Sequence, residues 1–189
     1  MAKSKRQQYK PGAVVEIKLT NGKIAFGRLL PGVASTMAVY DFIIAQNEDY
    51  SIGGILNKPV LFYCGFYRDI ITKGIFKIIG VQEFMEREIE EMPFVFFMQD
   101  MVNIDDCVIY GVVKEERKVK PAECIGLERS SVWDEQGIIQ RIEDHYAGRR
   151  NFHVELDRVI LSKDDPRYLP PPKMLVWDFE KQVFYRKDR

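Results

Sequence analysis

The sequence has little of what would place it in a specialised class. Among its 189 residues are three cysteines, two histidines, and equal numbers of basic and acidic residues, 28 of each. Zero net charge leaves no global field to attract nucleic acid or an anionic membrane. Cys64, Cys107 and Cys124 are odd in number and form no C-x-x-C pair, which excludes a disulfide framework and a zinc ribbon. We expect all three to be buried, free thiols.

Long apolar segments are also missing, and we expect no leader sequence. The longest uncharged run, from Leu29 to Tyr40, has twelve residues, whereas a membrane span needs about 20. The start of the chain, Met1 to Lys10, is basic and polar with no apolar stretch behind it, unlike a secretory signal. We therefore expect a soluble protein of the reducing cytoplasm that contacts neither membrane nor nucleic acid directly.

Signatures of catalysis and of cofactor binding are absent as well. The sequence contains no G-x-G-x-x-G motif, no Walker loop and no G-x-S-x-G motif. We predict no catalytic residue, no cofactor and no metal, and hence a protein that is not an enzyme.

The clearest local signal is a β-hairpin. Ile17 and Leu19 alternate with polar residues, and Asn21-Gly22 follows before a second apolar run. Asn-Gly is typical of a two-residue type I′ turn, which would place Leu19 opposite Ile24 and Ile17 opposite Phe26. The same register places Val15 opposite Arg28, and it leaves Ala25 and Gly27 on a nearly bare second face.

Further apolar runs have strand length, and their aromatic and β-branched content favours strands. These runs are Met37–Ala45, Val60–Cys64, Ile75–Val81, Phe94–Met98 and Val108–Val113.

A helix is predicted at about 131–147, with Ser131 and Asp134 as a capping box and Gly148 as its stop. The charged segment Val81–Glu91 is a second helix candidate or a charged loop, and alternation over 152–157 predicts a last strand.

The C-terminal segment differs in composition from the rest. Pro170-Pro171-Pro172 predicts an extended spacer, and Met174–Trp177 with Gln182–Tyr185 predicts a hairpin. We expect this hairpin to pack on the main domain, because its aromatic side chains would be costly to expose.

Together these features predict a mainly β (α+β) fold: a curled antiparallel sheet or partly open barrel with one main helix. The domains expected are a flexible basic tail over 1–9, a single β domain over 10–163, and the spacer with its hairpin over 164–189.

One short pattern resembles a metal site. On a strand, His153, Glu155 and Asp157 would share one face, with His145 nearby. A metal-assisted hydrolase built on these residues is one alternative function. A solvated polar face opposite Phe152, Val154 and Leu156 explains the same pattern.

Charge is distributed unevenly along the chain. From Glu83 to Asp106 there are eight acidic residues and one basic residue, Arg87, a local net charge of −7. Such a stretch suits a basic protein partner, although charge runs also simply solubilise a surface. As partner-binding residues we predict five: Glu86, Glu90, Glu91, Asp105 and Asp106.

The first hairpin also carries a family resemblance. Lys10-Pro11-Gly12-Ala13-Val14-Val15-Glu16-Ile17 and Asn21-Gly22-Lys23-Ile24-Ala25-Phe26-Gly27-Arg28-Leu29 resemble the start of immunity protein family twenty-six of bacterial polymorphic toxin systems. Tyr40-Asp41-Phe42 fits the strand that follows, and the resemblance is expected to extend to about Val159.

This resemblance implies a mostly β, cytoplasmic protein that neutralises a cognate toxin domain by direct contact and catalyses no reaction. A basic toxin such as a nuclease would suit the acidic stretch. A small β-barrel that binds a ligand or peptide on the face of Ala25 and Gly27 is a further alternative.

Overall fold

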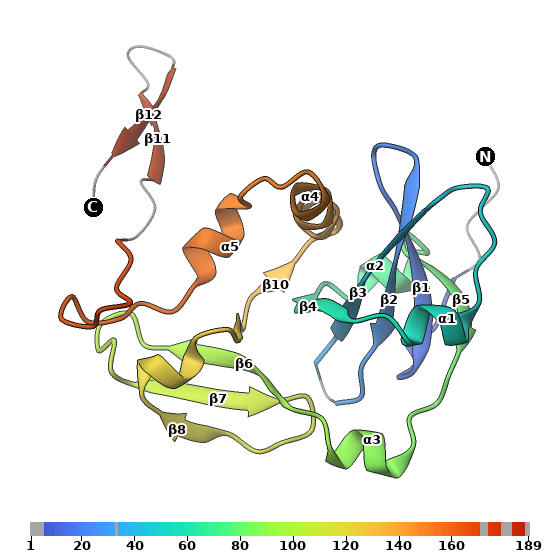
Figure 1. Cartoon of the computed structure of the whole chain (residues 1–189), viewed down its shortest axis with the longest axis horizontal. Helices are drawn as coiled ribbons and strands as arrows, with labels where there is room; N and C mark the ends of the chain where they lie inside the picture. The colour runs from blue at the N-terminus through green and yellow to red at the C-terminus, as the bar shows by residue number, and fades with distance from the viewer. Residues whose placement is uncertain (1–5, 33, 171–173, 179–182, 188–189) are drawn as a thin grey trace.

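The computed structural model of the chain describes residues 6–32, 34–170, 174–178 and 183–187. Ten of its strands are divided between two mixed sheets, and neither sheet closes into a barrel (Figure 1). The predicted mainly β class with few helices is confirmed, but two open sheets replace the single curled sheet. Among the described residues, no helix has both the length and the apolar character needed to cross a bilayer.

The larger sheet has six strands in the order β10-β4-β3-β2-β1-β5. All neighbours are antiparallel except β10 and β4. Its strands are β1 (Ala13–Lys18), β2 (Lys23–Leu29), β3 (Thr36–Ala45), β4 (Val60–Phe66), β5 (Lys77–Val81) and β10 (Val132–Trp133).

The smaller sheet has four strands in the order β8-β7-β6-β9, with β6 and β9 parallel. A 3₁₀ turn, η1 (Pro121–Cys124), connects β8 to β9 and packs on β6 and β7. The strands are β6 (Phe94–Gln99), β7 (Cys107–Gly111), β8 (Arg117–Val119) and β9 (Glu128–Arg129). Each of the five apolar runs expected as strands therefore overlaps one strand of these two sheets.

The C-terminal hairpin also forms, as a separate two-stranded sheet of β11 (Met174–Asp178) and β12 (Val183–Lys187). Residues 171–173 of the proline spacer lie outside the described residues, as do the side chains of the hairpin. Its packing on the main domain stays a prediction.

The predicted register of the first hairpin is wrong by one residue. Ile17 lies opposite Ala25, and Val14 lies opposite Arg28. The turn has three residues instead of two: the Gly22 N–H donates to the Leu19 carbonyl, and Gly22 has a φ of +80°. A three-residue hairpin loop that ends in a left-handed glycine is common.

Both faces of the larger sheet are covered, so no bare face exists. Val15, Ile17 and Ala25 face one core, which α2 (Asp69–Thr72) and α4 (Glu135–Tyr146) complete with side chains such as Ile71 and Ile142. Val14, Phe26 and Tyr40 face a second core closed by Ile55 of α1 (Ile52–Leu56). A third core fills the smaller sheet around Phe97, Cys107 and Cys124.

The expected Ala25 and Gly27 groove is occupied by Met37. A Cβ placed on Gly27 would lie 2.3 Å from the Met37 Sδ, and Met37 is fully buried. A barrel that binds its ligand on this face is therefore excluded.

The main helix begins later than predicted. Asp134, and not Ser131, caps α4 by accepting the Gly137 N–H at 2.7 Å, because Val132 and Trp133 are already used in β10. Gly148 follows the C-terminus of α4 with a φ of +64°, as expected for its stop. Within the second helix candidate, Val81–Glu91, only α3 (Glu86–Glu90) is helical.

The strand predicted over 152–157 is wrong. This segment forms a helix, α5 (Phe152–Asp157), because the Asn151 side chain caps it by accepting the N–H groups of His153 and Val154.

Part of the expected N-terminal tail makes hydrogen bonds to the body. The Gln7 side chain donates to the carbonyls of Ile71 and Phe76 and accepts the Ile78 N–H. The Tyr9 hydroxyl donates to the Leu30 carbonyl at 3.0 Å. These contacts attach residues 7 and 9 to the larger sheet.

Because Met37 packs directly over Gly27, a methyl group added at position 27 should destabilise the fold. Gly27→Ala should lower the free energy of unfolding by about 1–3 kcal/mol, because the buried Met37 side chain would have to shift to admit the added methyl group. Gly53→Ala is the matched control, since an added methyl on α1 meets nothing within 4 Å. Urea unfolding of both variants measures the difference, and equal stabilities would contradict this packing.

Candidate interaction surface

The five predicted partner-binding residues lie in two clusters. Glu86, Glu90 and Glu91 are exposed on α3 or directly after it, whereas Asp105 and Asp106 are exposed in the loop between β6 and β7. The six residues of β6 separate the clusters by about 20 Å at the usual rise of a strand. Figure 1 shows α3 and this loop at opposite ends of the smaller sheet.

Half of the acidic stretch is neutralised by ion pairs. Glu83 pairs with Lys10 at 2.9 Å, Glu88 with Arg28 at 3.2 Å, Glu91 with Arg87 at 2.7 Å, and Asp106 with Lys118 at 3.7 Å. Asp100 is occupied within its loop, where it accepts the N–H groups of Val102 and Asn103.

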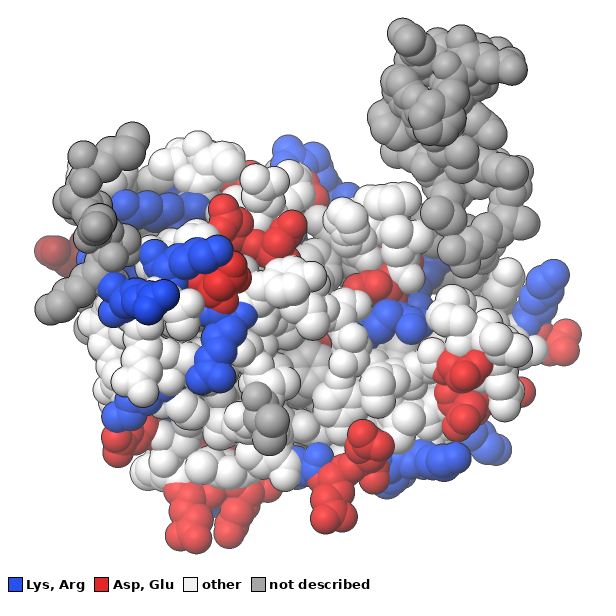
Figure 2. All heavy atoms as spheres, turned by 180° about the vertical axis from the view of Figure 1, so that it is seen from behind, with Lys and Arg blue, Asp and Glu red and all other residues white. Residues whose placement is uncertain are grey.

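Glu86, Glu90 and Asp105 form no ion pair with any described residue. Figure 2 shows acidic side chains projecting at the lower edge of the molecule, where α3 lies, while both signs mix over the rest of that face. The outer side of α3 therefore carries uncompensated negative charge.

A groove of about 260 Å³ lies between α3, the larger sheet and the smaller sheet. Its lining is mostly apolar and aromatic, with a few charged groups. The lining residues are Arg28, Leu30, Ala38, Tyr40, Val60, Tyr63, Phe84, Glu88, Glu91, Met92, Pro93, Val95 and Val112.

Arg28 is the central polar group of this groove. Its side chain is only 7% exposed, and its guanidinium carbon lies 3.5 Å from the centre of the Phe84 ring. One terminal nitrogen donates to Glu88 and the other to the Gln82 carbonyl at 3.0 Å. The Nε atom is buried and has no acceptor among the described residues.

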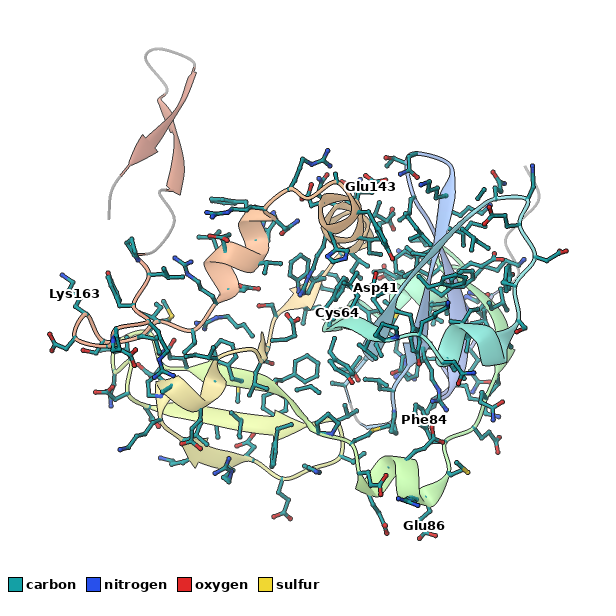
Figure 3. The ribbon with its side chains drawn as sticks, in the orientation of Figure 1. Asp41, Cys64, Phe84, Glu86, Glu143 and Lys163 are labelled. Atoms are coloured by element: carbon teal, nitrogen blue, oxygen red, sulfur yellow. The ribbon has the colours of Figure 1, made fainter. Side chains whose placement is uncertain are left out.

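These contacts connect α3 to the sheet. In Figure 3, Phe84 lies between α3 and the strands of the larger sheet, whereas Glu86 lies on the outer side of the helix. The pKa of Glu88 lies below its usual range for two reasons. The larger cause is the Met85 N–H, which donates to the Glu88 carboxylate at 2.7 Å, and the smaller one is the neighbouring Arg28. Glu88 is therefore ionised at neutral pH and neutralises the buried guanidinium.

Two tyrosines contribute to the wall of the groove. Burial raises the pKa of Tyr40 and of Tyr63, so both stay protonated at neutral pH. Tyrosine, arginine and methionine, which all line this groove, are among the residue types enriched in the centres of protein interfaces.

Most of the residues that line this groove are not among the five that the sequence analysis predicted. Glu91 is the only predicted residue that lines it. Arg28 carried a usable signal, since a cation within an apolar strand needs a partner. Phe84 and Tyr63 carried none.

The residues of the metal hypothesis are not brought together. On the helix α5, His153 and Asp157 are one turn apart, but Glu155 points to the other side. Glu155 pairs with Arg158 at 3.5 Å, and His153 packs edge-on against Trp133. Within the described residues, no group of three His, Cys, Asp or Glu side chains is placed to hold a metal ion.

Comparison with known proteins gives one match. The family described as immunity protein 26 matches residues 10–108, just over half of the chain. The chain belongs to this family.

The family match ends in β7, short of the Val159 expected from the resemblance. It includes α3 and every lining residue of the groove except Val112. No curated protein and no solved structure matches the chain. The α3 groove thus lies in the part of the chain that defines membership of the immunity protein family.

The Arg28–Glu88 pair predicts a pH-dependent stability. Glu88→Gln should lower the free energy of unfolding at pH 7 by about 1 kcal/mol, because it removes the counter-charge of the buried Arg28, and the loss is limited because Glu88 is itself partly exposed. The folded-state pKa of Glu88 is lowered, so its contribution is complete above the ordinary glutamate pKa of about 4.3 and is lost as the pH falls through the lower folded-state value.

Urea unfolding of the wild type and of Glu88→Gln from pH 7 into acid measures this dependence, and the gap between them should narrow in acid. Glu90→Gln, on the same helix, is the control and should differ from the wild type by less than about 0.5 kcal/mol throughout. A gap that stays constant with pH would rule out the ion pair as its cause.

Proposed function

We propose that this protein binds a cognate bacterial toxin domain and neutralises it by direct contact, without catalysing a reaction. The observation that carries the proposal is its membership of the immunity protein 26 family over residues 10–108. The structure adds a surface suited to such a partner, namely the acidic outer side of α3 beside an aromatic groove.

The charge of this surface favours a basic partner, and a nuclease toxin would be one. Complementary charge raises the association rate and discriminates against wrong partners. A standard interface covers about 800 Å² on each protein, a patch about 30 Å across. Such a patch spans both the α3 cluster of Glu86, Glu90 and Glu91 and the loop cluster of Asp105 and Asp106.

The groove is the proposed position of an anchor side chain from the toxin. Binding energy in interfaces concentrates in a few desolvated pockets surrounded by a polar rim. Arg28, Phe84 and the two tyrosines supply such a pocket, and the carboxylates of α3 form its rim.

The proposed place of action is the cytoplasm, with no membrane or direct nucleic-acid contact. Cys64, Cys107 and Cys124 are all free and buried, which suits a reducing compartment. Burial raises the pKa of Cys64 to about 12, so this thiol is unreactive at neutral pH.

The experiment that tests the proposal is co-expression with the toxin domain encoded beside this gene. Survival of the host, together with nanomolar or tighter binding of the purified pair by calorimetry, would support it. Death of the host despite soluble expression of this protein, with no binding in vitro, would overturn it.

Charge reversal on α3 tests where the toxin binds. Glu86→Lys with Glu90→Lys should slow association about tenfold at low salt and weaken its salt dependence, while dissociation changes less. Asp49→Lys with Asp164→Lys is the control, because it makes the same change in net charge at exposed acids on other elements. Stopped-flow association at several salt concentrations is the measurement.

Equal effects of the two pairs would remove α3 from the proposed interface. Asp105→Lys with Asp106→Lys, measured in the same way, tests the loop cluster independently.

A further inference from the structure

A second cavity, of about 220 Å³, lies between β4, α4 and the start of α5. It uses different elements from the α3 groove, and Figure 1 shows α4 and α5 on the opposite side of the molecule from α3. The lining residues are Leu61, Phe62, Arg141, His145, Arg149, Asn151, Val154 and Glu155.

Arg141 is the buried charge of this cavity. The residue is 9% exposed, and its guanidinium carbon lies 3.8 Å from the centre of the Phe62 ring and 5.3 Å from that of Trp133. Its Nη2 atom donates to Glu128 at 2.6 Å. Its Nη1 atom is buried and has no acceptor among the described residues.

Glu128 therefore satisfies only part of this guanidinium. Arginine presents five N–H donors, and carboxylates commonly engage them in pairs. The single contact to Glu128 leaves Nη1, a buried and charged donor, without an acceptor in a residue that lines the cavity, and this is costly unless an acceptor reaches it.

The neighbouring acids are occupied elsewhere. Asp144 accepts from Gln140 at 2.8 Å, from Arg149 at 2.9 Å and from Asn151 at 2.9 Å. Burial opposes ionisation of Asp144, but these hydrogen bonds outweigh it and lower its pKa. Glu155 pairs with Arg158 at 3.5 Å. His145 lies 3.7 Å from Asp41.

We propose that this cavity binds the carboxylate of an aspartate or glutamate side chain from a protein partner. Arg141 supplies the buried donor, and the terminal nitrogens of Arg149, whose side chain is 58% exposed, supply a second cation at the rim. Leu61, Phe62 and Val154 form the apolar wall for the methylene groups of that side chain.

A single negative charge suits the site better than a dianion. The two arginines already face Glu128 and Asp144, so a dianionic phosphate would meet more repulsion than a monoanionic carboxylate.

This proposal does not rest on the α3 surface. Of the lining residues, only Leu61 and Phe62 fall within the family match, and the polar groups follow it in the chain. The cavity would therefore add a partner contact outside the part of the chain that matches the family. This contact would select acidic groups, whereas the α3 surface would select basic ones.

The test is an NMR titration of the ¹⁵N-labelled full chain, with the arginine Nε–H signals as the readout. The probe is N-acetyl-glutamic acid α-amide, whose only carboxylate is that of the side chain. We expect saturable shifts at Arg141 and Arg149 in the millimolar range, and at least tenfold weaker binding of N-acetyl-glutamine α-amide. Sodium phosphate at equal ionic strength is the third titrant.

Two variants complete the test without removing the buried Arg141. Arg149→Gln should weaken binding of the glutamate probe at least threefold, and Arg150→Gln, at the exposed neighbour that does not line the cavity, should not.

Four results would each overturn the proposal. They are no saturable shift with the glutamate probe, equal binding of the glutamine probe, binding of phosphate in preference to glutamate, and equal losses in Arg149→Gln and Arg150→Gln.

Discussion

The pairing of β1 with β2 determines which side chains each face of the larger sheet receives. A shift of one residue in a hairpin exchanges the faces of a whole strand. With the turn ending at Gly22, Ile17 and Ala25 face α4. Phe26 faces α1 on the other side, and Arg28, two residues later, reaches the groove under α3. Both cores and the position of the groove follow from this register.

Two buried arginines use the same chemistry at different places. Arg28 stacks on Phe84 and pairs with Glu88, while Arg141 stacks on Phe62 and pairs with Glu128. Each connects a helix to a strand or loop, each lines a cavity, and each keeps one buried nitrogen without an acceptor among the described residues. A planar, always charged guanidinium suits this role because it stacks on aromatic rings and also makes directed hydrogen bonds. The two cavities nevertheless differ in their rims, which are acidic at α3 and partly basic beside α4.

Elements with a strong local signal were predictable. The five apolar strand runs, the end of α4 at Gly148 and the C-terminal hairpin all form where the pattern placed them. Two errors have local causes. Asn21-Gly22 is compatible with a three-residue loop as well as with a two-residue loop. The alternation over 152–157 is typical of a strand, but the segment forms a helix that Asn151 caps.

The sequence by itself determined the mainly β class, the family, the buried free thiols and the acidic stretch, because these depend on composition, short motifs and local periodicity. Only the tertiary structure decided which acids are neutralised, since Arg28 and Glu88 are sixty positions apart and their contact depends on how α3 packs on β2. It also decided that β6 divides the acidic stretch into two clusters. The grooves beside Arg28 and Arg141 are likewise products of packing, because each is lined by side chains from several elements that no local pattern relates.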